Sequence, residues 1–217
     1  MFKIAIFDLD GTLLNTIDDL ANACNYALKE FSFPIHEVNK YKIFVGNGIY
    51  KLVERAVPND KRDKETVLKV LGLFTDYYNK HMMDMTKPYE GIIELLDEIK
   101  RRNIKLAVVS NKKHEFTLEI VKKYFGNKFD MVIGHRENYK EKPDPTSVLE
   151  VLEEFSIEKS NCIYVGDSNI DIITANNAGV KSVGVTWGFR DEEELSKEGA
   201  TYIVNNIKEL RDIIIDN

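Results

Sequence analysis

Short, continuous runs of apolar residues recur along the chain. They lie at Ile4–Phe7, Leu106–Val109, Met131–Ile133, Cys162–Val165 and Val183–Val185. A strand that is covered on both faces has no need of alternating polar positions, so runs of this kind are typical of buried strands in parallel sheets. The pattern therefore predicts five short strands.

Apolar residues spaced three or four positions apart predict amphipathic helices between and after these strands. The predicted helices cover about residues 92–99, 116–124, 148–155 and 207–214. Strands that alternate with helices favour parallel pairing through right-handed crossovers. The fold class predicted from the pattern is therefore α/β, with a doubly wound parallel sheet.

The first crossover is unusually long, since nearly a hundred residues separate the first predicted strand from the second. One crossover helix needs far fewer. The interval has its own helical spacing over residues 17–31, 52–56 and 67–78, and Gly46-Asn47-Gly48 opens the middle helix. We therefore predict an inserted all-helical subdomain at residues 16–85 and a core made of residues 1–15 and 86–217. Such an insert is placed to act as a lid, and the alternative is a purely structural insertion.

Composition and charge narrow the functional classes. Of 217 residues, 43% are hydrophobic and 30% charged, as in ordinary globular proteins, and the net charge of −6 gives no support to nucleic-acid binding. Cys24 and Cys162 fall inside predicted elements and are expected to be buried and reduced. The first strand begins too early to leave room for a signal peptide, and no apolar stretch reaches the roughly 20 residues of a membrane span. We expect a cytoplasmic protein without membrane contact, whose oligomeric state the sequence does not specify.

Two carboxylates follow the first predicted strand, in the segment Asp8-Leu9-Asp10-Gly11-Thr12. In an extended chain, residues two apart point to the same side. Carboxylates so close repel each other unless a cation or a proton transfer uses them. Because open parallel sheets bind ligands at the carboxyl ends of their strands, this segment predicts a reactive, metal-binding site.

Polar segments also follow the other predicted strands. They are Ser110-Asn111-Lys112, Lys142-Pro143-Asp144, Gly166 to Asp171, and Thr186-Trp187-Gly188. Alone, each has an ordinary explanation as a turn, a solvated lysine or the first turn of a helix. If the strands are parallel, however, all four gather at the edge that holds Asp8 and Asp10. Asp18 and Asp19, in contrast, are expected to be exposed acids at the start of a helix.

Taken in order, these segments resemble the motifs of the haloacid dehalogenase superfamily of phosphohydrolases, and they span nearly the whole chain. The resemblance implies a Rossmann-like core with a helical cap inserted after the first strand. It also implies a Mg²⁺-dependent enzyme that acts on a small phosphorylated metabolite.

The resemblance assigns a role to each motif. Asp8 would be the nucleophile and Asp10 the general acid and base. Mg²⁺ would be held by Asp8, the backbone carbonyl of Asp10, and Asp167, while Asp171 would orient these ligands or Lys142. Ser110 and Lys142 would hold the phosphoryl oxygens and share in catalysis. The implied substrate-binding set is Gly11, Thr12, Ser110, Asn111 and Lys142 in the core, with Gly46, Asn47, Gly48, Lys51 and Arg55 in the insert.

Three segments resemble phosphoglycolate phosphatase-like members in particular. They are Val45-Gly46-Asn47-Gly48, Val109 to Lys112, and Gly184 to Arg190. The two glycines of the first segment would let the backbone approach an anionic substrate at a helix N-terminus. Lys51 and Arg55, one helical turn apart, would meet its carboxylate or second phosphate, and the alternative is that they are solvated helix charges.

Other activities stay open at this point. Pyrophosphate hydrolysis and β-phosphoglucomutase-like phosphoryl transfer use the same core, since a fold does not settle a function. A phosphate-binding regulatory module without catalysis is the alternative from another class, and the presence of both the nucleophile and the acid argues against it. Haloacid dehalogenation is disfavoured because it does not call for the acid at position 10 or a Mg²⁺ site.

Overall fold

The computed structural model describes residues 1–137 and 139–216, and the chain divides into two compact units. Residues 1–14 and 88–217 form one, called here the core unit, and residues 15–87 form the other, called the helical unit. The chain passes between them at β2 (Leu14–Asn15) and β3 (Lys87–Pro88), and these two short strands pair with each other.

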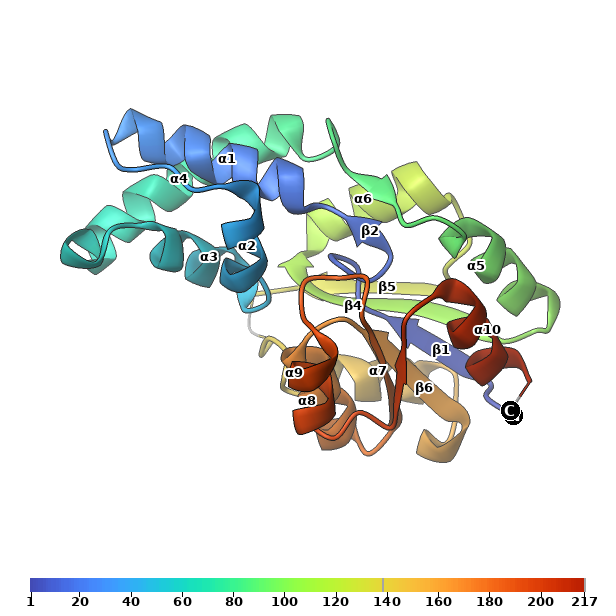
Figure 1. Ribbon diagram of the computed structural model, residues 1–217. Helices are drawn as coiled ribbons and strands as arrows, with labels where there is room; N and C mark the ends of the chain where they lie inside the picture. The colour runs from blue at the N-terminus through green and yellow to red at the C-terminus, as the bar shows by residue number, and fades with distance from the viewer. Residues whose placement is uncertain (138, 217) are drawn as a thin grey trace. The chain divides into compact units, whose positions relative to one another are not determined.

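Within the residues that the structure describes, six parallel strands form the sheet of the core unit (Figure 1). They are β1 (Ile4–Phe7), β4 (Lys105–Lys113), β5 (Met131–His135), β6 (Cys162–Gly166), β7 (Lys181–Val185) and β8 (Tyr202–Val204). Their spatial order is β5-β4-β1-β6-β7-β8, so the chain reverses its direction of travel across the sheet between β1 and β6. The predicted doubly wound parallel sheet is confirmed. The sequence pattern did not predict β8, a three-residue edge strand that is mostly half-buried.

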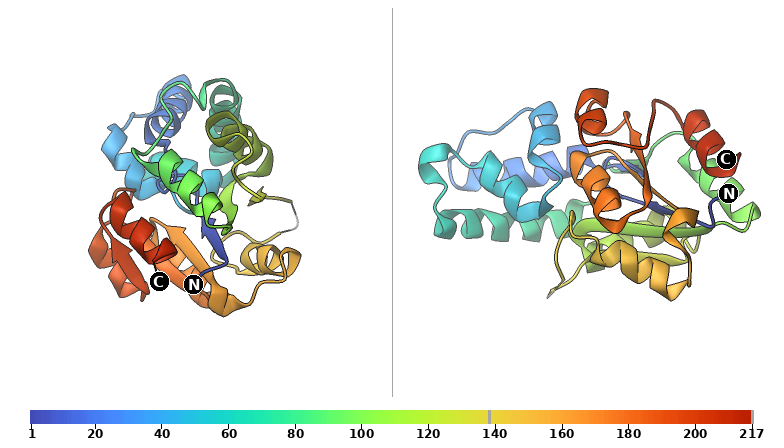
Figure 2. Two further views of the ribbon diagram at one scale, coloured as in Figure 1. Left: turned by 90° about the vertical axis from the view of Figure 1, so that its right-hand side faces the viewer. Right: turned by 90° about the horizontal axis from the view of Figure 1, so that it is seen from below.

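Helices cover both faces of this sheet (Figures 1 and 2). On one side lie α5 (Ile92–Arg101), α6 (His114–Phe125) and α10 (Ile207–Ile215), and on the other α7 (Thr146–Glu154) and α8 (Asn169–Ala178). The short α9 (Glu192–Lys197) packs against β7. Because strand residues alternate between faces, Ile4 and Ile6 point to the same side and pack with Val148 and Val151 of α7 and Ala175 of α8. This double cover explains why β1 is wholly apolar and why the buried stretch of its neighbour β4, Leu106 to Val109, is apolar as well.

The helical unit contains α1 (Ile17–Glu30), α2 (Val38–Phe44), α3 (Gly48–Ala56) and α4 (Lys64–His81), besides the short 3₁₀ turn Asn59–Lys61. Helix α1 packs along α4, and large aromatic side chains fill the centre, among them Tyr41, Phe74 and Tyr78. In the described part of the chain, no helix combines the length and the apolar character that a membrane span requires. Both cysteines are buried free thiols, as predicted.

One acidic residue of α1, Asp19, is buried, although the sequence pattern predicted that it is exposed. Asp19 is only 2% exposed, and its carboxylate accepts hydrogen bonds from the backbone N–H groups of Met85 and Thr86 at 2.9 and 2.8 Å. The prediction that Asp19 is exposed was wrong, because its partners lie more than sixty residues later in the chain. Asp19 thus ties the start of the helical unit to its end.

Candidate active site

The sheet register gathers the ends of three strands. Phe7 is paired with Val108 of β4 on one side and with Val165 of β6 on the other. The backbone N–H of Asp8 also donates to the carbonyl of Val165 at 2.9 Å. Asp8 therefore follows β1 at the point where the strand order reverses, which is the position where open α/β sheets bind ligands.

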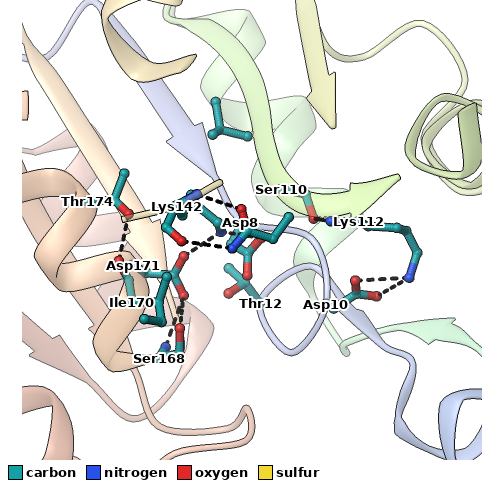
Figure 3. Close-up of polar contacts among 12 residues, drawn as sticks. Asp8, Asp10, Thr12, Ser110, Lys112, Lys142, Ser168, Ile170, Asp171 and Thr174 are labelled. Atoms are coloured by element: carbon teal, nitrogen blue, oxygen red, sulfur yellow. Dashed lines mark hydrogen bonds and ion pairs between the residues drawn. The ribbon is translucent and has the colours of Figure 1, made fainter. Parts of the chain in front are cut away.

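Lys142 lies between two carboxylates (Figure 3). Its Nζ is 2.8 Å from Oδ1 of Asp8 and 2.7 Å from Oδ1 of Asp171, and its side chain is only 5% exposed. Asp171 belongs to α8, whereas Lys142 precedes α7. The structure thus brings together three residues from separate motifs that the sequence analysis expected to find in one place.

The orientation of Asp171 is fixed by further hydrogen bonds. Its Oδ2 accepts from the backbone N–H and the hydroxyl of Ser168 at 3.1 and 2.6 Å, and the Tyr164 hydroxyl donates to Oδ1 at 3.3 Å. The same Tyr164 hydroxyl lies 3.2 Å from Nζ of Lys142. With its oxygens so engaged, Asp171 is built to hold Lys142 in place.

Sequence reasoning missed both of these supporting residues. Ser168, three residues before an acid at the start of a helix, carries the signature of a capping box and could have been found in that way. Tyr164 lies inside an apolar strand and looks like an ordinary core aromatic, so nothing in its surroundings in the sequence indicated its contacts.

The segment after β4 fixes the backbone of Lys142. The side-chain amide of Asn111 accepts from the Lys142 N–H at 2.7 Å and donates to its carbonyl at 3.1 Å. Neighbouring Ser110 is buried, and its hydroxyl accepts from the backbone N–H of Lys112 at 3.2 Å. Asn111 was predicted to bind substrate, and in the structure its amide holds the backbone of Lys142.

Carboxylate oxygens of Asp8, Asp167 and Asp171 lie within 4.8 Å of one another, and all three residues are buried. Lys142 supplies a single positive charge to these three acids. Closely spaced hard oxygen ligands with surplus negative charge fit a divalent cation such as Mg²⁺. The acidic cluster could therefore hold a metal ion.

The orientation of Asp167 is also fixed. The hydroxyl of Thr12 donates to its Oδ1 at 3.0 Å, and the Phe189 N–H donates to Oδ2 at 2.8 Å. A Cβ atom at Gly11 or at Gly188 would come within 2.3 Å of the Asp167 side chain, and Gly11 in addition has a φ of +87°. Gly11 and Thr12, predicted as substrate contacts, thus shape the surroundings of Asp167.

Crowding of the acids changes their titration. Burial raises the pKa of Asp8 to about 7, with a further rise from the charge of Asp171 and an opposing effect from Lys142. Burial likewise raises the pKa of Asp167 well above its usual value, and Asp171 and Asp8 add to the rise. Burial alone would lower the pKa of Lys142, but the charges of Asp171 and Asp8 outweigh it and raise that pKa. The cluster therefore resists full ionisation without a further cation.

The carboxylate of Asp10 points away from this cluster (Figure 3). Its two oxygens accept hydrogen bonds from Nζ of Lys112 at 2.9 and 3.0 Å. The Lys112 side chain is 3% exposed and that of Asp10 is 20% exposed. Lys112 belongs to the motif Ser110-Asn111-Lys112, in which only the first two residues had an assigned role.

In the helical unit, the predicted binding residues lie in the turn between α2 and α3 or within α3 itself. Gly46 and Gly48 have φ angles of +113° and +75°, which favour glycine. Arg55 of α3 donates to the carbonyl of Phe44 at 2.9 Å and to Oδ1 of Asn47 at 2.7 Å. Arg55 thus fixes the shape of this turn.

This chain is similar in sequence and in fold to proteins described as phosphatases. The model of the haloacid dehalogenase-like hydrolases matches residues 5–185. The phosphoglycolate phosphatase of Neisseria meningitidis serogroup A is 34% identical over 94% of this chain and 90% of its own length. Phosphoglycolate phosphatase 1 of Pseudomonas aeruginosa is 30% identical over 96% and 78%, respectively. The crystal structure of a candidate phosphoglycolate phosphatase from Lactobacillus delbrueckii subsp. bulgaricus superposes with a TM-score of 0.95 at 33% identity, covering 100% of this chain and 99% of that one.

Proposed function

The chain belongs to the haloacid dehalogenase-like hydrolase family and is a phosphoric monoester hydrolase, and we propose that it is a Mg²⁺-dependent phosphoglycolate phosphatase that works through an aspartyl-phosphate. The observation that carries the chemistry is the contact between Asp8 and Lys142 beside the acidic cluster. The substrate is supported by the two curated phosphoglycolate phosphatases that align with most of this chain.

In the first step, a carboxylate oxygen of Asp8 would attack phosphorus. The new O–P bond makes an aspartyl-phosphate as the bond from phosphorus to the leaving oxygen breaks. Asp10 would supply the proton that this leaving oxygen takes up, which releases glycolate as the alcohol.

In the second step, water would attack the phosphorus of the aspartyl-phosphate. Asp10 would accept a proton from that water while the bond between Asp8 and phosphorus breaks. The products are inorganic phosphate and the free Asp8 carboxylate, so the enzyme is ready for another turnover.

Lys142 and the Ser110 hydroxyl would hold the phosphoryl oxygens during both steps. Positively charged and hydroxyl donors that are fixed beforehand stabilise the charge that develops in the transition state, often by several kcal/mol. Support for this role comes from the bonds that fix Lys142 on two sides, its ammonium by Asp171 and its backbone by Asn111.

Asp8, Asp167 and the backbone carbonyl of Asp10 would hold Mg²⁺. The bound ion would neutralise negative charge on the acids and on the phosphoryl group. Asp171 belongs to the cluster as well, but its oxygens already accept hydrogen bonds from Ser168, Tyr164 and Lys142. We therefore assign Asp171 to positioning and keep it out of the ligand set.

The helical unit would act as the cap that selects the substrate. It is inserted into the chain just after Asp8 and Asp10, and it carries the predicted anion-binding turn. Lys51, half exposed on α3 and 2.6 Å from Glu54, would leave this surface pair to meet the substrate carboxylate. An exposed pair of this kind is worth under about 1 kcal/mol, so the exchange costs little.

A substrate panel tests the proposal. The purified protein is assayed with Mg²⁺ against phosphoglycolate, pyrophosphate, sugar phosphates, nucleotides and p-nitrophenyl phosphate. We expect phosphoglycolate to give the highest kcat/KM, and we expect Asp8→Asn to abolish turnover of all of them. Lys51→Ala should raise the KM for phosphoglycolate but leave that for p-nitrophenyl phosphate, which has no carboxylate, unchanged; Lys69→Ala, from an exposed pair on α4, is the matched control.

The alternatives give other results in the same assay. A preference for pyrophosphate would indicate a pyrophosphatase, and isomerisation of a sugar phosphate with slow release of phosphate would indicate a mutase. Turnover by Asp8→Asn at the wild-type rate would refute the assigned nucleophile. If p-nitrophenyl phosphate is not hydrolysed at all in Mg²⁺, the non-catalytic alternative gains support.

A further inference from the structure

Lys112 is a buried lysine with no role in the mechanism above. Its ammonium contacts both carboxylate oxygens of Asp10, a residue 102 positions earlier in the chain, at 2.9 and 3.0 Å. A charge this deeply buried is costly to keep unless a partner compensates it. The ion pair therefore compensates the charge of Lys112 and also restrains the orientation of the Asp10 carboxylate.

The position of this ion pair matters because other positive charges nearby compete with Lys112 for the Asp10 carboxylate. Lys142 and any cation held by the acidic cluster would attract the short Asp10 side chain toward Asp8. A carboxylate drawn into that cluster would sit among the metal ligands, away from the leaving oxygen and the attacking water. Figure 3 shows the Asp10 carboxylate turned toward Lys112, on the opposite side from Lys142.

We propose that Lys112 is a positioning residue that holds the Asp10 carboxylate outside the acidic cluster, where it can accept the proton of the attacking water. This inference rests on the proposed function, since it takes Asp10 as the acid and base. When the aspartyl-phosphate is hydrolysed, the water oxygen bonds to phosphorus, the bond from Asp8 to phosphorus breaks, and the water proton passes to Asp10. Lys112 itself exchanges no proton and touches no reacting atom.

The test separates the two halves of the reaction with p-nitrophenyl phosphate. Its leaving group needs no proton, so kcat/KM, which reports formation of the phosphoenzyme, depends little on Asp10. Hydrolysis of the phosphoenzyme still needs a base, and its loss lowers kcat. For Lys112→Met we expect kcat to fall about 10- to 100-fold and kcat/KM to change less than about threefold. A burst of nitrophenolate and a phosphorylated protein in quenched samples, detected by intact mass, should accompany the fall.

Three further variants complete the design. Asp10→Asn should show the same split between kcat and kcat/KM, and the double variant should be no slower than Asp10→Asn, since both changes remove one function. Lys113→Met removes the next lysine of β4, which is exposed, and should behave as wild type. Lys112→Gln keeps a donor of similar length and should fall between wild type and Lys112→Met, and it replaces the methionine variant if that one does not fold.

The results that would overturn this inference differ from those that would overturn the proposed function. Equal loss in kcat and kcat/KM for the Lys112 variants would overturn the inference, because it would indicate a contact with the phosphoryl group or general damage to the fold. So would a further loss when Lys112→Met is added to Asp10→Asn. If phosphoenzyme accumulates in Asp10→Asn but not in the Lys112 variants, Lys112 does not position Asp10, while the proposed function still holds. If Asp8-dependent phosphoenzyme forms in none of the proteins, the proposed function itself fails.

Discussion

At the scale of single residues, Lys142 is the cation that compensates two buried carboxylates of the site. Its ammonium contacts Asp8 and Asp171 while almost entirely buried. Replacing it would leave both carboxylates without their cation. Asp8 has a pKa of about 7 even with Lys142 present, so in the variant it can take up a proton. Protonation would reduce the free-energy cost of leaving its carboxylate buried without a cation.

We therefore predict that Lys142→Ala raises KM, lowers kcat, and lowers the unfolding free energy by roughly 1–3 kcal/mol, the cost of a buried acceptor that loses its donor. Steady-state kinetics and urea unfolding measure the three quantities. Lys140→Ala is the matched control, since that lysine is exposed and pairs only loosely with Asp144 at 3.7 Å. Unchanged phosphate-ester kinetics in Lys142→Ala would remove Lys142 from the site.

Single residues also mark the limit of prediction from sequence. Asp8, Lys142 and Asp167 could be placed together because each follows a strand or a motif, and parallel strands bring their ends to one edge. Lys112 and Asp19 could not be placed, because a charged residue is exposed by default and their burial depends on partners far along the chain.

At the scale of elements, the strands were predictable and some of their neighbours were not. Double cover makes the buried stretches of the central strands apolar, and the predicted runs fall within the observed strands, most of which extend a few residues further. Helix α8 has no single apolar stripe, because buried residues such as Ile170, Ile172 and Ala175 point in several directions. Helix α9 and strand β8 are too short to produce a clear period.

The turn after β7 supports a prediction about metal binding. A Cβ at Gly188 would lie 2.3 Å from Cβ of Asp167, so Gly188→Ala must displace that side chain without removing its carboxylate. We expect the Kd for Mg²⁺ to rise about 10- to 100-fold, as when an outer partner of a metal ligand is lost. Isothermal titration of the metal-free protein measures it. Unchanged affinity would mean that Asp167 does not bind the metal from its present position.

A second glycine gives the control and an opposite prediction. Gly72 lies within α4, and a Cβ built there meets nothing within 4 Å. Gly72→Ala should stabilise the protein by about 0.5–1 kcal/mol, because alanine loses less backbone freedom in a helix. Urea unfolding is the measurement, and the affinity for Mg²⁺ should stay at the wild-type value. A loss of stability would mean that α4 needs this glycine for a close contact.

For the whole molecule, the buried acids link stability to pH and to the metal. Between the usual Asp pKa of 3.8 and about 7, folded Asp8 keeps a proton that the unfolded chain has already lost. The unfolding free energy of the metal-free protein should therefore fall as pH rises through this window, and Asp167, whose pKa is also raised, acts in the same direction. Near neutral pH, burying the ionised forms of these acids thus lowers the unfolding free energy of the metal-free protein.

Mg²⁺ should reverse this trend, because it binds the ionised acids of the folded protein. We predict that saturating Mg²⁺ raises the thermal midpoint more at pH 8 than at pH 5, while the metal-free protein is less stable at pH 8 than at pH 5. Thermal unfolding with Mg²⁺ or with a chelator, at a series of pH values, gives both curves. Asp8→Asn should flatten the metal-free curve, since an amide cannot titrate. A metal-free protein that gains stability from pH 5 to pH 8 would show that the acids are already compensated, and the case for a cation at this site would fail.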